Sequence, residues 1–122
     1  MNKNEVIQDL IFLPVKYANE DKSPYALVKE SGYFEFHDEI TEKDIFDILV
    51  KHPELVQEWV AYSEDQRMSP VWYIHDKNGQ YYVSYYSKNE APLPPYISDD
   101  LLEVCAVFIK RKSEQVRLEF LT

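Results

Sequence analysis

The sequence predicts an α+β fold, in which helices cover one face of a small antiparallel sheet. Three observations lead to this prediction. An Asn-Gly pair lies between two runs rich in apolar and aromatic residues, which predicts a hairpin over residues 71–87. Helix start signals precede apolar stripes elsewhere in the chain. Residues 116–120 alternate between apolar and charged side chains, which predicts a C-terminal strand at about residues 115–121.

Length and composition indicate a single domain. The chain has 122 residues, of which 45% are hydrophobic and 15% aromatic. A chain of this length buries roughly two-thirds of its unfolded surface around one core, and its aromatic and aliphatic content is that of a packed protein rather than a disordered one. We therefore expect residues 1–122 to form one domain.

The first forty residues carry two helix signals. Apolar residues at helical spacing predict a short helix that ends before Pro14. Ser23 is a suitable N-cap for a helix that starts at Pro24, and Gly32 supplies its left-handed stop. Residues 33–36 are a further candidate strand. The apolar positions of the first helix are Val6, Ile7, Leu10, Ile11 and Phe12.

Two consecutive helices are expected in the middle of the chain. Thr41 and Asp44 form a variant of the capping box, with acids in the first turn that follows. Pro53 interrupts this helix and opens a second one, from residue 54 to about residue 66. The apolar stripes of the two helices are Ile45, Phe46, Ile48 and Leu49, then Leu55, Val56, Trp59, Val60 and Tyr62.

The hairpin turn at Asn78-Gly79 also predicts which strand residues face each other, because a two-residue turn sets the register. We expect Trp72, Ile74, Asp76, Tyr81, Val83 and Tyr85 on the core face, and Tyr73, His75, Tyr82 and Ser84 on the other. After the hairpin, Ser98 is expected to cap a helix over about residues 99–112, which then leads into the C-terminal strand.

The negative charge is concentrated in one segment. The formal net charge is −9, and residues 30–65 hold eleven acids and two bases, so the rest of the chain is balanced. Two interpretations stand: a solvated helical face, or a docking surface for a basic partner. The acids that we consider for docking are Asp38, Glu39, Asp44, Asp47, Glu54 and Glu58. Such a balance argues against direct binding to nucleic acid or to an anionic membrane.

The hairpin is rich in tyrosine, and its predicted register places Tyr73, Tyr82 and Tyr86 on the face opposite the core. This face is either covered by another element or partly exposed, and in the second case it offers stiff contact area for a protein partner. A groove for single-stranded nucleic acid needs interleaved cations, whereas only Lys77 and Lys88 flank these rings.

No arrangement of residues points to catalysis or to a bound cofactor. His37, His52 and His75 show no spaced constellation. His75 and Asp76 are adjacent on a strand and therefore point to opposite faces. The acids do not have the ligand spacing of a calcium loop, and two glycines are too few for a phosphate-binding loop. We expect no metal, no cofactor and no enzymatic activity.

The compartment follows from the cysteine content and the N-terminus. Cys105 is the one cysteine of the chain, so no internal disulfide can form, and we expect this residue to be part of the core. The first ten residues do not combine a basic segment with an apolar stretch, and no apolar run reaches the roughly 18 residues of a membrane span. We expect a cytoplasmic protein.

Three segments together resemble the small acidic immunity proteins of bacterial toxin–immunity systems, including contact-dependent growth inhibition: residues 68–74 (MSPVWYI), 78–86 (NGQYYVSYY) and 105–109 (CAVFI). The resemblance implies a cytoplasmic protein that binds one cognate toxin domain, commonly a nuclease, and blocks its active site or substrate surface. Two alternatives remain, a regulatory or adaptor domain and a small histidine-dependent enzyme.

Overall fold

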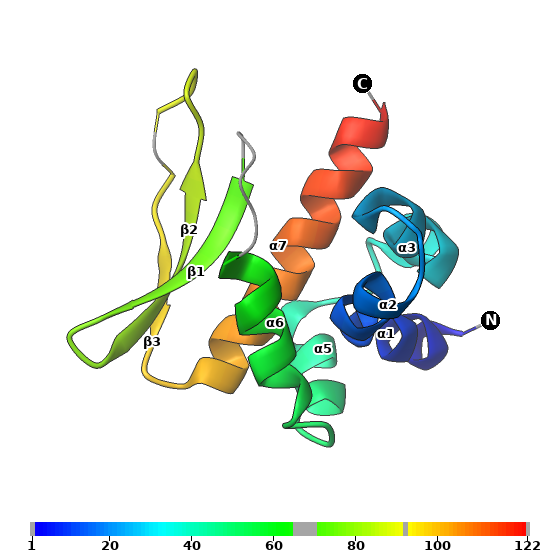
Figure 1. The fold of residues 1–122 in the computed structure, drawn as a ribbon, viewed down its shortest axis with the longest axis horizontal. Helices are drawn as coiled ribbons and strands as arrows, with labels where there is room; N and C mark the ends of the chain where they lie inside the picture. The colour runs from blue at the N-terminus through cyan, green and yellow to red at the C-terminus, as the bar shows by residue number, and fades with distance from the viewer. Residues whose placement is uncertain (1, 65–70, 92, 122) are drawn as a thin grey trace.

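A computed structural model describes residues 2–64, 71–91 and 93–121, and it confirms the α+β class (Figure 1). Within these residues there are seven helices and a three-stranded antiparallel sheet in the order β1-β2-β3. The helices gather on one side of the sheet. The elements are α1 (Lys3–Ile11), α2 (Leu13–Asn19), α3 (Pro24–Ser31), α4 (Tyr33–Phe36), α5 (Glu42–Leu49), α6 (Leu55–Glu64), β1 (Val71–Lys77), β2 (Gln80–Tyr86), β3 (Tyr96–Ser98) and α7 (Leu101–Leu121).

The N-terminal helices begin and end largely where the local signals predict. The first helix ends before Pro14, as expected, and this proline then lies in the first turn of α2, where its missing N–H costs nothing. In α3 the Ser23 hydroxyl accepts a hydrogen bond from the N–H of Ala26 (3.1 Å), and Gly32 ends the helix with φ 91°. Both features of α3 confirm the prediction.

The prediction of a strand at residues 33–36 is wrong, because these residues form the short helix α4. The left-handed Gly32 redirects the chain, and its carbonyl then accepts hydrogen bonds from the N–H groups of Glu35 and Phe36. Tyr33 is fully buried against α7. A helical turn therefore satisfies the backbone and places one aromatic ring in the core.

The two middle helices confirm the capping prediction. The Thr41 hydroxyl accepts from the N–H of Asp44 (3.1 Å), and the Asp44 carboxylate accepts from the N–H of Thr41 (2.9 Å). Helix α6 starts at Leu55, two residues after Pro53. The last two residues of the predicted helix, 65 and 66, lie outside the described residues.

The hairpin has the predicted turn and the predicted register. Asn78 and Gly79 take φ values of 55° and 79°, and Ile74 lies opposite Val83 with both side chains buried. The N–H of Ile74 points away from β2 and donates to the Ser63 hydroxyl of α6 (2.7 Å), which satisfies a donor at the sheet edge. The third strand is β3, not the C-terminal segment.

The largest error of prediction concerns the C-terminus, where α7 runs without a break to Leu121 and no strand forms at residues 115–121. The cap is Asp100, whose carboxylate accepts from the N–H of Leu102 (3.0 Å), rather than Ser98. Residues 101–121 contain neither glycine nor proline, so nothing stops the helix. At helical spacing Val116 becomes buried, and Phe120 stacks on Phe34 of α4 with ring centroids 5.1 Å apart.

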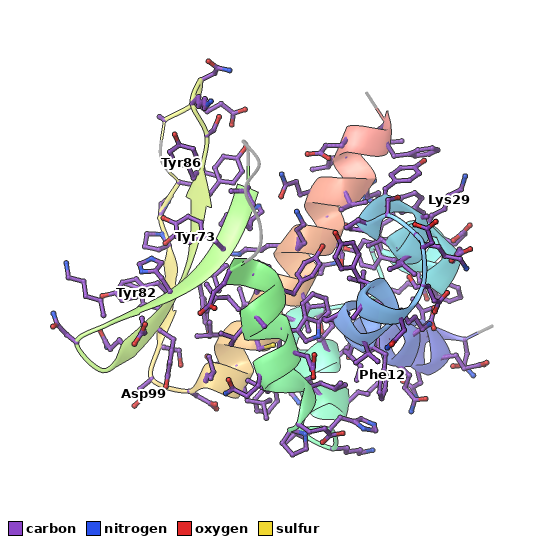
Figure 2. The ribbon with its side chains drawn as sticks, viewed as in Figure 1. Phe12, Lys29, Tyr73, Tyr82, Tyr86 and Asp99 are labelled. Atoms are coloured by element: carbon purple, nitrogen blue, oxygen red, sulfur yellow. The ribbon has the colours of Figure 1, made fainter. Side chains whose placement is uncertain are left out.

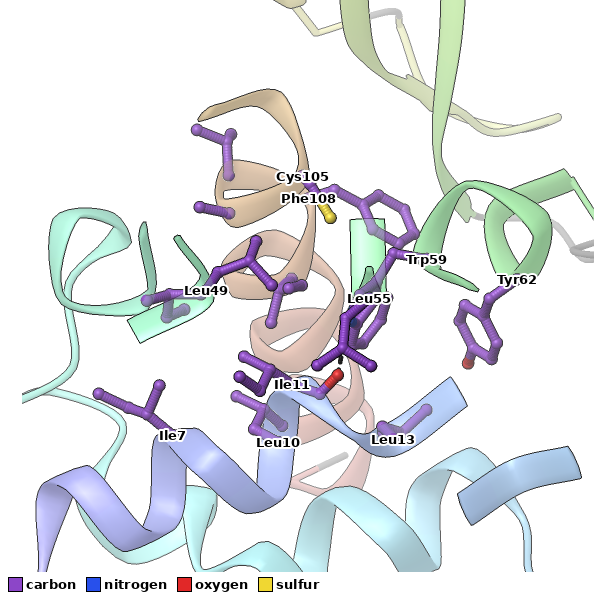
Figure 3. Packing of buried hydrophobic residues seen from close by; sticks show 14 of the residues in the cluster. Ile7, Leu10, Ile11, Leu13, Leu49, Leu55, Trp59, Tyr62, Cys105 and Phe108 are labelled. Carbon is purple, nitrogen blue, oxygen red and sulfur yellow. Dashed lines mark hydrogen bonds between the residues drawn. The ribbon is translucent and has the colours of Figure 1, made fainter. Parts of the chain in front are cut away.

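The core lies where α7 meets the other helices and the sheet. Figure 3 shows the rings of Trp59 and Phe108 among aliphatic side chains of α1, α5 and α6. The Trp59 indole donates to the carbonyl of Ile11 (2.9 Å), so this fully buried polar atom has its partner. Helix α7 packs against α5 and against all three strands, and it therefore holds the sheet and the helical part together.

Candidate partner-binding surfaces

Four predicted acids belong to α5 and to the connection before it. Asp38 and Glu39 are exposed between α4 and α5, and Asp47 is exposed on α5, where the Lys43 ammonium lies 2.9 Å from its carboxylate. Asp44 is different. Its carboxylate serves the Thr41 cap, and it also pairs with an ammonium group of α1.

The pKa of Asp44 reflects this internal role. The Thr41 backbone N–H is the main cause of its lowered pKa, and Lys3, at 3.1 Å, lowers it further. The Asp44 carboxylate thus caps helix α5 and also links α5 to α1 through Lys3. Of the four acids, Asp38, Glu39 and Asp47 are therefore the ones that a partner can reach without disturbing a helix cap.

The two remaining predicted acids lie at the start of α6. Glu54 and Glu58 are both exposed, and Glu54 lies 3.6 Å from the ring nitrogen Nδ1 of His52. Leu55 and Val56, which lie between these two acids in the sequence, are buried in the core, as the apolar stripe predicted. Both acids thus face solvent from the helical part of the molecule, which is the arrangement that electrostatic docking requires.

The predicted tyrosines share the outer face of the sheet. Figure 2 shows Tyr73, Tyr82 and Tyr86 along the sheet on the side away from the helices. Tyr86 is exposed, while Tyr73 and Tyr82 are partly buried. Ile97 of β3 lies opposite Tyr82 and is exposed as well, so it extends the apolar area of this face. No described helix lies over this side of the sheet in Figure 1, which agrees with the partly exposed alternative.

A histidine joins two of these tyrosines. The His75 ring stacks on Tyr82, with centroids 4.9 Å apart, and on Tyr73, at 5.3 Å. Its Nε2 lies 2.9 Å from the Ser84 hydroxyl. The three rings therefore form a continuous aromatic row whose side-chain entropy is already reduced, which favours protein contacts.

The acids and the tyrosines do not form one surface. The tyrosines lie on the outer face of the sheet, whereas α5 and α6, which carry the acids, lie on its other side (Figure 1). A partner that contacts both sets has to reach around an edge of the sheet. The structure thus divides the predicted docking residues into two separate groups.

Sequence reasoning missed a third region, three hollows that follow one side of α7. We call them together the α7 groove. The largest, about 580 Å³, lies between α7 and the inner side of the hairpin, and two others, of about 370 and 450 Å³, lie toward α5 and α4. Glu42 lines all three. The predicted C-terminal strand hid this region, because only a continuous helix places residues 114–119 beside the hairpin.

A polar cluster closes one side of the groove. The Tyr33 hydroxyl donates to Glu114 (2.5 Å) and accepts from Lys110 (2.8 Å), which also donates to the carbonyl of His37 (2.6 Å). Arg117 forms two hydrogen bonds to Glu114, at 3.1 and 3.0 Å. Burial lowers the pKa of Lys110 and raises that of Tyr33. The cluster joins α4 to α7.

The residues that could support catalysis are spread over the fold. His37, His52 and His75 lie on different elements, and no group of three metal-ligating side chains is found within residues 2–64, 71–91 and 93–121. Two of the histidines line hollows that carboxylates also line. His75 shares a hollow with Glu64 and Asp76, and His37 shares another with Asp38 and with Glu114, whose carboxylate lies 3.8 Å from the His37 Nδ1. Cys105 is buried as expected, and burial raises the pKa of its thiol, so it is a core residue.

Comparisons of the chain with protein-family models, with curated proteins and with solved structures give no match. In the described part of the chain, no helix combines the length and the apolar character that crossing a bilayer requires.

Proposed function

We propose that this protein is a non-catalytic immunity protein that binds and neutralises a cognate bacterial toxin domain in the cytoplasm. The observation that carries the proposal is the exposure of Asp38, Glu39, Asp47, Glu54 and Glu58 on the helical side of the molecule. All five side chains are exposed and can attract a basic partner, and they belong to the segment that holds the whole net charge.

The physical basis is competition with nucleic acid. A nuclease binds phosphates with a basic cleft, and an acidic protein surface can occupy that cleft in place of the substrate. The acids then set the association rate, and buried aromatic or aliphatic contacts set the residence time. The resemblance of residues 68–74, 78–86 and 105–109 to immunity proteins supports the same partner class.

The decisive experiment begins with the gene neighbourhood, where the proposal predicts a gene for a toxin-like domain beside the gene for this protein. Expression of that domain alone should arrest growth, and co-expression of this protein should restore it, with both proteins recovered as one complex after purification. A catalytically inactive version of the domain provides the binding control. Growth arrest that persists at an equal level of this protein, with no complex, would contradict the proposal.

A small histidine-dependent enzyme is the second candidate, and the position of His37 in a hollow with Asp38 and Glu114 is the observation that favours it. Against it, the Glu114 carboxylate already receives Tyr33 and Arg117, and the 3.8 Å separation exceeds the reach of a general base. Restoration of growth at wild-type level by His37→Ala and by His75→Ala removes this candidate. An adaptor domain differs from the leading proposal in its partner alone.

A further inference from the structure

The largest hollow of the α7 groove has apolar walls. Trp72 and Tyr85 form one wall from the inner side of the hairpin, with ring centroids 4.9 Å apart. Leu118 of α7 and Leu93 of the connection to β3 line it too, and these two side chains are 51% and 48% exposed. Exposed leucines beside an aromatic pair are a contact surface for apolar side chains of another molecule.

The three hollows follow α7 for most of its length. Glu103 and Val107 line the hollow toward α5, and Leu118 and Glu119 line the largest one at the far end. With Lys110 and Glu114 between them, residues 103, 107, 110, 114 and 118 recur every three or four residues and therefore share one side of the helix. Sixteen residues separate Glu103 from Glu119, which corresponds to about 24 Å at ~1.5 Å per residue. The groove is long enough for an α-helix of about four turns.

The groove carries an excess of acids. In the largest hollow they are Glu42, Glu90, Glu114 and Glu119, with the bases Lys110 and Arg111. The two flanking hollows add Asp38, Asp47 and Glu103, with the base Lys43. Seven acids and three bases leave a formal charge of −4. The α7 groove is therefore both apolar and negative.

The three bases are engaged with groups of this chain. Lys43 pairs with Asp47, and Lys110 is held by the polar cluster described above. The Arg111 guanidinium lies over the Trp72 ring, 4.8 Å from its centroid. Glu119 is close enough to Tyr85 to help raise its pKa, after the larger effects of partial burial and of Glu90. Acids thus face the apolar wall from both sides.

We infer that the α7 groove binds a basic amphipathic helix of a protein partner, with apolar side chains on the Trp72–Leu118 walls and Lys or Arg residues beside the acids. A helix fits better than an extended segment. The walls of the groove are side chains and offer no sheet edge with which an extended backbone could form hydrogen bonds, whereas a helix satisfies its own backbone groups. This inference rests on the proposed function, since it assigns the segment of the toxin domain that docks here.

The first test uses a synthetic probe, a 16-residue peptide with leucines at i, i+3, i+4 and i+7 spacing and lysines elsewhere. The control peptide has the same composition in an order without an apolar face. Of the two tryptophans, Trp72 lines the groove and Trp59 is 1% exposed in the core. NMR titration should shift the Trp72 indole signal saturably and leave that of Trp59 in place. An unchanged Trp72 signal overturns the inference.

Matched variants locate the binding. Leu118→Arg and Glu119→Lys should each weaken peptide binding about tenfold, which is the effect of losing one central contact. Leu121→Arg and Glu35→Lys make the same changes at exposed positions outside the groove, and they should change the affinity less than about twofold. All four positions are exposed, so circular dichroism should show an unchanged fold. Equal weakening by the controls overturns the inference.

The outcomes separate this inference from the proposed function. If the toxin domain is neutralised equally by wild type and by the Leu118→Arg variant, the function holds and the groove is not its docking site. If the peptide binds as expected but no toxin domain is neutralised, the groove is a binding site and the proposed function is wrong.

Discussion

The hairpin has two aromatic faces with different surroundings. On the inner side, Trp72 and Tyr85 face α7, a guanidinium and several acids. On the outer side, Tyr73, His75 and Tyr82 form a stacked row, and no described helix lies over this side of the sheet in Figure 1. Each of the two strands thus presents rings alternately to the charged groove and to the open outer face. The difference shows that aromatic residues alone do not define a docking site, because the charge and the neighbouring element decide what can bind.

The largest expected effect is a difference in the free energy of unfolding between variants of the inner face and variants of the outer face. Ile74→Ala removes a buried side chain between β2 and α6 and should lower the free energy of unfolding by about 3 kcal/mol. Tyr73→Ala, one residue away on the outer face, should cost about 1 kcal/mol or less, because the ring is partly exposed. Urea unfolding of both variants measures the difference. Equal losses would mean that the outer face is also core.

The next effect concerns the groove side and depends on pH. Burial alone would raise the pKa of Glu114, but the hydrogen bonds from Arg117 and Tyr33 lower it below its ordinary value. A lowered pKa stabilises the fold above the unfolded value of about 4.3, and the stabilisation is lost as the pH falls through the folded value. Glu114→Gln should cost about 2 kcal/mol at pH 7.

Urea unfolding at pH 7 and at about pH 3 checks this prediction. The free energy of unfolding of the wild type should fall toward that of Glu114→Gln as the pH decreases. Glu119→Gln, on the same helix and exposed, is the control and should retain the pH dependence of the wild type. If the stability of Glu114→Gln falls with pH as strongly as that of the wild type, Glu114 is not the group responsible.

A smaller effect tests the acids of the helical side. Charge reversal at Asp47, Glu54 and Glu58 should slow association with a basic toxin domain about tenfold at low salt, because long-range attraction mainly sets the association rate. The effect should shrink as the salt concentration rises toward 0.5 M, where charges are screened within roughly 5 Å. Stopped-flow or surface-binding kinetics provide the rates. Unchanged association would remove the docking role of this segment.

The smallest effect is expected on the outer face. The double change Tyr82→Ala and Tyr86→Ala should raise the dissociation rate of the same complex by about threefold and leave the association rate unchanged. Leu118→Arg in the groove should raise the dissociation rate more. The reverse order would make the outer face the main contact and the groove secondary.

The parts of the fold that were predictable depend on single strong local signals. Asn78-Gly79 needs positive φ at two positions, Thr41 with Asp44 forms a reciprocal cap, and Gly32 ends a helix. Each signal acts within a few residues, so the sequence alone is sufficient. The segment at residues 115–121 has no such signal. Its alternation is also compatible with a helix, and only packing against α4 and the hairpin decides between them.

The candidate site was predictable to the same extent. Asp38, Glu39, Asp47, Glu54 and Glu58 are exposed, and the three tyrosines share one face, because charge and strand alternation are local properties. Asp44 is taken up by a cap and an ion pair whose second partner lies 41 residues away. The α7 groove is formed by residues of α5, the hairpin and α7 together. No single stretch of the sequence therefore predicts it.

The position of Cys105 makes the two faces easy to observe. Its thiol is inaccessible in the folded state, and the chain has no other cysteine. A cysteine introduced at Leu118 or at Tyr86 therefore becomes the sole site for a fluorophore or spin label on the native protein. Paired labels on this protein and on its partner can then report which face the partner approaches, without removal of the native residue.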